Sequence, residues 1–135
     1  MKIRATYDGD LRTSLEHLGS GERIKTDAPL DNHGRGEYFS PTDLLCSSLA
    51  SCMLTIMAIA ADKHKVDIRG AFVEVDKKMS TSPRMIASIR LSIIFKQSFS
   101  KRHRTVLERA ALSCPVHRSL SQKIDIDISF KYPEY

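Results

Sequence analysis

The sequence predicts an α+β fold in which antiparallel β-sheets wrap around two central helices. Apolar and polar residues alternate within residues 2–26, 66–95 and 124–132, as in strands with one buried face. Residues 44–61 carry no charge, and apolar residues recur at helical spacing in residues 101–114. The resulting order, β-β-β-α-β-β-α-β, is typical of an α+β domain and not of a parallel α/β sheet.

The first third of the chain is predicted to form strands. Ile3, Ala5 and Tyr7 alternate with polar residues, which indicates a half-buried strand. A tight turn leads to a return strand at residues 11–15, and a glycine turn leads to a third strand at residues 22–26. The polar, glycine-rich stretch that follows is predicted to be a loop that forms the rim of a site.

A long helix is predicted to begin at Pro41. Ser40 suits the N-cap, and proline suits the first helical position. Because residues 44–61 are uncharged on every face, we expect this helix to be buried all round. Its serines and its small residues disfavour a membrane span. A chain this short cannot surround a helix of about 27 Å, so we predict a homodimer with this helix near the interface.

The second half of the chain is predicted to contain three more strands and a helix. Strands at residues 66–78 and 85–95 are joined by a hairpin turn, and the residues expected to point inward in the second are Ala87, Ile89, Leu91, Ile93 and Phe95. Ser100 is predicted to cap a helix that ends at Cys114, because Pro115 follows it. A short helix at residues 116–122 and a strictly alternating strand at residues 124–132 complete the chain.

Composition indicates one soluble domain that covers residues 1–135. Hydrophobic residues make up 41% of the chain and charged residues 27%, as in ordinary globular proteins. Three cysteines and no apolar leader after Met1 favour a reducing, cytoplasmic location. The net charge of +5 comes from scattered basic residues. The one dense basic cluster, residues 101–104, has no interleaved aromatic residues, so we expect no nucleic-acid partner.

Two cysteines have settings that suggest chemistry. Cys114 lies where a new helical turn begins, close in sequence to His117 and Arg118, and such settings lower a thiol pKa. It is either a reactive thiol or a packed helix-ending residue. Cys52 in its apolar helix is either a small hydrophobe or a nucleophile activated by a cation from elsewhere. Cys46 should lie about 120° around the helix from Cys52 and act as filler.

Other chemical motifs are missing from the sequence. The five histidines show no metal-ligand spacing and do not pair with cysteines at zinc-like separations. There is no phosphate-binding glycine loop and no G-x-S-x-G nucleophile motif. We therefore expect no metal and no cofactor.

Two segments together resemble the OsmC/organic hydroperoxide resistance family. They are SPTDLL followed by ASCM, at residues 40–45 and 50–53, and AALSCPV at residues 110–116. In the family a central helix carries the first motif, and a second helix ends in Cys-Pro-Val. The resemblance covers nearly the whole chain and is nearest to the OsmC-like branch.

The resemblance implies an intertwined homodimer whose central helices bring both cysteines together at the subunit interface. It also implies a cofactor-free thiol peroxidase that reduces organic hydroperoxides. Cys52 would be the peroxidatic cysteine, oxidised to a sulfenic acid, and Cys114 the resolving cysteine that closes a disulfide. A dithiol of the lipoyl type, or a small thiol, would then reduce that disulfide.

The chain departs from the hydroperoxide reductases at the polar partners of the reactive thiolate. Thr42 occupies the position of the family's glutamate. Asp43 beside it, the third residue after the predicted cap Ser40, is the candidate catalytic carboxylate. Arg12 matches the family's arginine best by placement, with Arg35 as a rival. The alternative hypothesis from these departures is a non-enzymatic protein that binds a small apolar ligand at the dimer interface.

Overall fold

The computed structural model describes residues 2–134, which form two compact units, residues 2–45 and 46–134. The predicted α+β fold and the predicted order of elements are confirmed. The elements are β1 (Ile3–Gly9), β2 (Arg12–His17), β3 (Arg23–Asp27), a short 3-10 turn (Leu30–Asn32), α1 (Pro41–Lys63), β4 (Phe72–Ser80), β5 (Met85–Ile94), α2 (Lys101–Leu112), α3 (Pro115–Ser119) and β6 (Asp125–Lys131).

The first unit contains an antiparallel sheet in the order β1-β2-β3. The register pairs Ala5 with Leu15, and Leu15 with Ile24, so apolar residues share one face. The prediction that β1 is half-buried is wrong for this unit, since Ile3 is 71% exposed and Tyr7 is 66% exposed. The alternation was identified correctly, but residues 2–45 alone do not cover the apolar face that it creates.

The start of α1 is the predicted cap. The Ser40 hydroxyl accepts the Asp43 N–H at 3.1 Å, and the Asp43 carboxylate accepts the Ser40 N–H at 3.0 Å. These reciprocal bonds satisfy two backbone N–H groups that would otherwise lack partners at the start of the helix. Ser40 is almost fully buried, so the cap also gives a buried hydroxyl its hydrogen-bond partner.

Within one chain the buried side of α1 is a single stripe, and the predicted burial all round, which needs a second subunit, stays a prediction. The stripe comprises Cys46, Leu49, Ala50, Met53, Met57 and Ala61. On the opposite side Ile59 is 50% exposed. Spacings of three and four residues turn only one face of a helix to its own domain. By length and composition α1 is apolar enough to cross a membrane, a property that core helices of soluble proteins share, and a third of its most apolar window is buried.

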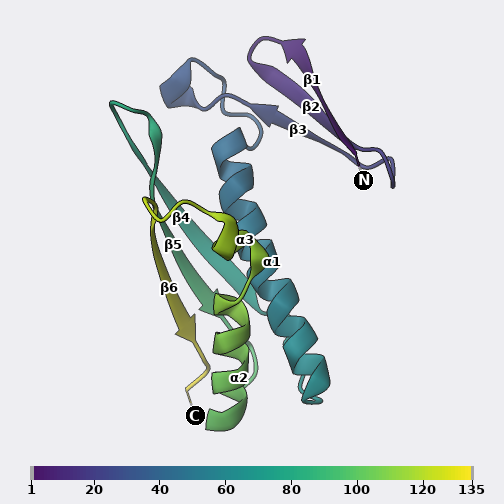
Figure 1. The fold of residues 1–135 in the computed structure, drawn as a ribbon, viewed down its shortest axis with the longest axis vertical. Helices are drawn as coiled ribbons and strands as arrows, with labels where there is room; N and C mark the ends of the chain where they lie inside the picture. Colours follow the sequence, from purple (N-terminus) through teal and green to yellow (C-terminus); the bar gives the residue numbers. More distant parts are fainter. Residues whose placement is uncertain (1, 135) are drawn as a thin grey trace. The chain divides into compact units, whose positions relative to one another are not determined.

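The second unit contains the sheet β4-β5-β6, and α1 and α2 run along one face of it (Figure 1). Ile89, Leu91 and Ile93 of the central strand β5 are fully buried. β4 pairs with β5 antiparallel as predicted, whereas β5 and β6 are parallel. The correction follows from the connection, since α2 and α3 carry the chain back to the start of the sheet before β6 begins.

A local irregularity in β5 changes which residue points inward at its start. Ile86 is buried and Ala87 is half-buried, the reverse of the predicted alternation. The register shifts between Lys78 and Met79, where an extra residue of β5 opposes β4. A bulge of this kind moves the following side chains to the other face, so strict alternation holds only from Ile89 onward.

The boundary between α2 and α3 differs from the predicted one. Ser100 caps α2 as expected, with its hydroxyl accepting the His103 N–H at 3.1 Å. The helix ends at Leu112, two residues before the predicted end, and Cys114 is the N-cap of α3. α3 runs from Pro115 to Ser119 and is shorter than the predicted helix at residues 116–122. Because the boundary lies here, the Cys114 side chain caps α3 and accepts the backbone N–H of His117.

Candidate functional site

Cys114 is held in the short connection between α2 and α3. Its side chain is fully buried, and its sulfur accepts the backbone N–H of His117 at 3.4 Å. Proline at the next position suits the first turn of a helix, because its missing N–H would be unsatisfied there in any case. The Cys-Pro pair therefore fixes the sulfur at a helix start, as the sequence suggested.

Cys52 lies on α1 and is half-buried. Its thiol lies close enough to that of Cys114 to affect the protonation of Cys114. The structure thus brings together the two cysteines that belong to different motifs and different helices. Both are reduced, and their thiols are close enough to interact directly. The chemical role of each remains a prediction.

The surroundings of Cys114 raise its thiol pKa above the ordinary value. Burial is the main cause, and the neighbouring thiol of Cys52 adds to it. The backbone N–H groups of His117 and Val116 act in the opposite direction, because they stabilise the thiolate. Burial prevails, so Cys114 is a protonated thiol at neutral pH. This direction is opposite to the one that a helix start alone would give, so burial decides it.

Cys46 belongs to the buried stripe of α1 and is 3% exposed. A buried thiol in an apolar stripe behaves as a small hydrophobic side chain. This position agrees with the predicted packing role of Cys46 and makes it a control residue for the other two cysteines.

Arg12 lies on β2 in the first unit, with acidic partners that the sequence did not reveal. Its guanidinium donates to the Glu37 carboxylate at 2.9 Å and is 3.5 Å from the Asp27 carboxylate. It also lies over the Tyr38 ring, 5.1 Å from the centroid. The hydrogen bond to Glu37 is the main cause of the raised pKa of Arg12. The predicted role of Arg12 toward Cys52 stays a prediction.

Asp27 is the buried member of this cluster. Its carboxylate accepts the backbone N–H of Glu37 at 3.0 Å, and this bond is the main cause of its lowered pKa. Arg12 and the backbone N–H of Arg35 lower that pKa further, against the effect of burial. Arg35, the rival of Arg12, therefore contributes its backbone here, and its side chain is exposed. No sequence motif marks Asp27 or Glu37, because their contacts depend on how the loop after β3 folds back.

The residues in place of the family's glutamate form the start of α1. The Thr42 hydroxyl lies 3.2 Å from the Ser40 hydroxyl, and the Asp43 carboxylate bonds to the Ser40 N–H. The structure thus gives Asp43 a capping role, which the sequence had also indicated. Its predicted catalytic role is not tested by these contacts.

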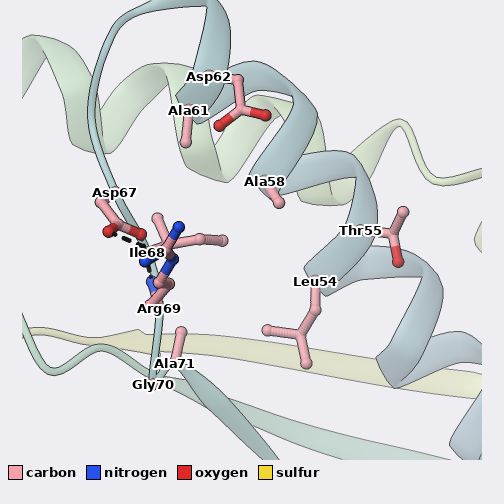
Figure 2. A pocket seen from close by; sticks show the side chains of 10 residues that line it. All are labelled: Leu54, Thr55, Ala58, Ala61, Asp62, Asp67, Ile68, Arg69, Gly70 and Ala71. Atoms are coloured by element: carbon pink, nitrogen blue, oxygen red, sulfur yellow. Dashed lines mark hydrogen bonds and ion pairs between the residues drawn. The ribbon is translucent and has the colours of Figure 1, made fainter.

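A separate pocket of about 490 Å³ lies in the second unit, and Figure 2 shows its lining. The side chains come from the C-terminal half of α1 and from residues 67–71. Its charged lining residues include Asp62, Asp67 and Arg69, the last two ion-paired at 3.7 Å. The rest of the lining is mostly small or apolar, and none of the candidate catalytic residues contributes to it.

Among residues 2–134 the structure contains no cluster of three or more histidine, cysteine, aspartate or glutamate side chains that could hold a metal ion. The site that the geometry offers is therefore the thiol pair itself, Cys52 with Cys114. Two adjacent reduced thiols can be oxidised to a disulfide and reduced again by thiol exchange.

Known proteins resemble this chain in sequence and in fold. The sequence model of the family described as OsmC-like protein matches residues 34–129. A protein from Psychrobacter arcticus 273-4, to which an osmotic stress induced and detoxification response role is ascribed, is 45% identical and superposes with a TM-score of 0.92. The match covers 96% of this chain and 95% of that one. A search of curated proteins by sequence finds no match.

Two more distant structures share the fold. The organic hydroperoxide resistance protein OsmC of Legionella pneumophila is 14% identical, with a TM-score of 0.76 over 96% of this chain and 95% of that one. An organic hydroperoxide resistance protein of Elizabethkingia anophelis is 13% identical, with a TM-score of 0.76 over 98% and 97%. On the family match and the 45% identical structure, the chain belongs to the OsmC-like protein family.

Proposed function

We propose that this protein is a cysteine-based peroxidase that reduces organic hydroperoxides at the expense of a dithiol. The observation that carries the proposal is the direct interaction of the Cys52 and Cys114 side chains. In the proposed cycle the Cys52 thiolate attacks the outer peroxide oxygen, the alcohol leaves, and Cys52 becomes a sulfenic acid. Condensation with the Cys114 thiol forms the disulfide and releases water.

The two sulfurs are assigned by their burial and protonation. Cys52 is half-buried and can meet a peroxide, whereas Cys114 is fully buried. The thiol of Cys114 is protonated at neutral pH, so its proton is available to the departing hydroxyl group when the disulfide forms. These differences favour Cys52 as the peroxidatic residue and Cys114 as the resolving residue.

The substrate class in this proposal comes from the family. Two members that share the fold are named organic hydroperoxide resistance proteins. The apolar residues of α1 that flank Cys52, such as Met53 and Ile56, are compatible with an organic substituent. We propose a lipoyl-type or small thiol as the reductant, and Arg12 as the cation that stabilises the Cys52 thiolate. The proposed chemistry needs no cofactor.

A homodimer is part of the proposal. Each unit leaves large apolar side chains exposed, with Ile24 at 51% and Ile59 at 50%. A second subunit would remove these side chains from water, and burial of apolar surface favours association. Sedimentation velocity should show one species of twice the chain mass, and a monomer at micromolar concentration would contradict the dimer.

The proposed activity is tested with cumene hydroperoxide and dihydrolipoamide. The wild-type protein should consume peroxide in proportion to its concentration, and Cys52→Ser should abolish this consumption. Cys46→Ser is the matched control and should retain the activity, because Cys46 lies in the buried stripe of α1. A Cys52→Ser variant with full activity would overturn the assignment.

A further inference from the structure

The Cys52–Cys114 disulfide of the proposed cycle has two chemically different sulfurs. We propose that the reductant attacks the sulfur of Cys52 and that Cys114 leaves as a thiolate held by the backbone N–H of His117. This inference rests on the proposed function, because it concerns the disulfide of that cycle. It assigns the mixed-disulfide intermediate to one residue and gives the peptide group of His117 a role in the turnover.

Access is the first basis of the assignment. An attacking thiolate must approach the target sulfur in line with the S–S bond, so the approach to that sulfur must be open. Cys114 is 0% exposed in the described structure, enclosed where α2 ends and α3 begins. Cys52 is half-buried on α1 and presents its side chain to solvent more openly. The buried sulfur is therefore the one that an external thiol cannot reach.

The His117 N–H is the group that offsets the cost of a buried leaving thiolate, because burial raises the pKa of the Cys114 thiol. In thiol–disulfide exchange the sulfur that departs carries the negative charge, and exchange is faster when that charge is stabilised. The Cys114 sulfur already accepts the His117 N–H at 3.4 Å. Hydrogen bonds from the backbone to a sulfur strengthen when the sulfur becomes anionic.

The resulting sequence of steps balances. One thiolate of the dithiol attacks the Cys52 sulfur, a bond forms between the two, the Cys52–Cys114 bond breaks, and its electron pair goes to Cys114. Cys114 then takes a proton from solvent, as its burial requires. The second thiol of the reductant attacks the reductant sulfur that is bonded to Cys52. The reductant closes its own disulfide, and Cys52 leaves as a thiolate. The dithiol becomes a disulfide, and both cysteines are reduced.

The first experiment maps the intermediate in the wild-type protein. The disulfide is formed with diamide, so the test does not require the peroxidase activity. The oxidised protein is mixed with β-mercaptoethanol, quenched with acid after milliseconds, alkylated and digested. We expect the adduct on Cys52 and the alkyl group on Cys114, with at least about a tenfold excess over the reverse pattern, in line with one charge-assisted hydrogen bond. A majority of adduct on Cys114 would overturn the proposal.

The second experiment tests the His117 peptide group. His117→Pro removes the N–H, and His117→Ala is the matched control that keeps the N–H and removes the imidazole. We expect reduction of the disulfide by dihydrolipoamide to be about tenfold slower in His117→Pro and unchanged in His117→Ala. The pH at which Cys114 of the reduced proteins becomes reactive to iodoacetamide should also rise in the proline variant only. Equal rates in both variants, with both folded, would remove His117 from the mechanism.

The outcomes distinguish this inference from the proposed function. If diamide forms the disulfide and the adduct maps to Cys52, but peroxide gives no reaction, the regiochemistry stands and the peroxidase assignment fails. If peroxide closes the disulfide and the adduct maps to Cys114, the peroxidase stands and the assignment of the attacked sulfur fails.

Discussion

The thiols of Cys52 and Cys114 lie close enough to affect each other's protonation, although α1 carries one and the α2–α3 connection carries the other. The sulfur of Cys114 accepts the N–H of His117, so the backbone fixes its position. A fixed thiol beside a more accessible one is the arrangement that a two-cysteine redox cycle requires. It provides a site of attack and a resolving partner within reach.

The sulfenic acid on Cys52 should accumulate when the resolving thiol is removed. We predict that Cys114→Ser treated with one equivalent of cumene hydroperoxide gains one oxygen atom on Cys52, trapped by dimedone and located by peptide mapping. The serine hydroxyl cannot condense to a disulfide, so turnover stops after one peroxide. Cys52→Ser is the control and should give no dimedone adduct. An adduct on Cys114 in that control would reverse the two roles.

The two thiols should differ in alkylation. In the reduced wild-type protein at neutral pH, iodoacetamide should modify Cys52 well before Cys114, because burial keeps Cys114 protonated. Only thiolates react appreciably, so modification of Cys114 should increase as the pH rises above the ordinary range of a thiol pKa. Mass spectrometry of digests over a pH series measures both rates. Equal rates at neutral pH would contradict the burial argument.

The sequence predicted those features that depend on local pattern. The cap at Ser40 and Asp43, the alternation of β6 and the end of a helix before Pro115 all follow from nearest neighbours along the chain. The motifs around Cys52 and Cys114 also predicted the pair, through the resemblance to a family. The pairing direction of β5 and β6 and the bulge near Ala87 depend on how distant segments meet, which short-range periodicity does not encode.

Two further features could not be predicted from the sequence, for a related reason. They are the protonation of Cys114 and the acidic partners of Arg12. A helix start predicts a lowered thiol pKa, but burial by other elements reverses the direction. Glu37 reaches Arg12 only because the loop after β3 folds back on the sheet. Both effects arise from tertiary structure.

Asp27 should make stability depend on pH in the acid range. Its folded pKa is lowered below the ordinary value of 3.8, chiefly by the Glu37 N–H. A group with a lowered folded pKa stabilises the protein fully above its unfolded pKa. This contribution is lost as the pH falls through the folded value. Urea unfolding midpoints should therefore decrease below about pH 4. Asp27→Asn should show a lower midpoint at pH 7, with the difference from wild type narrowing in acid. A constant difference would contradict the linkage.

Asp43 should act on stability through the start of α1. We predict that Asp43→Ala and Ser40→Ala each lower the free energy of unfolding by roughly 0.5–2 kcal/mol, the usual loss for a helix cap. Asp43→Asn should lose less, because an amide oxygen can still accept the Ser40 N–H. Urea denaturation gives these values, and peroxide consumption by the folded variants is measured in parallel. Loss of activity in folded Asp43→Ala would return Asp43 to a catalytic role.

The most direct test of the central claim is the intact mass of the reduced protein after one equivalent of cumene hydroperoxide, followed by peptide mapping. The thiol pair predicts the loss of two hydrogen atoms, located to a Cys52–Cys114 bridge, with Cys46 still reduced. An unchanged mass would show that Cys52 does not react with the peroxide, and it would contradict the proposed peroxidase.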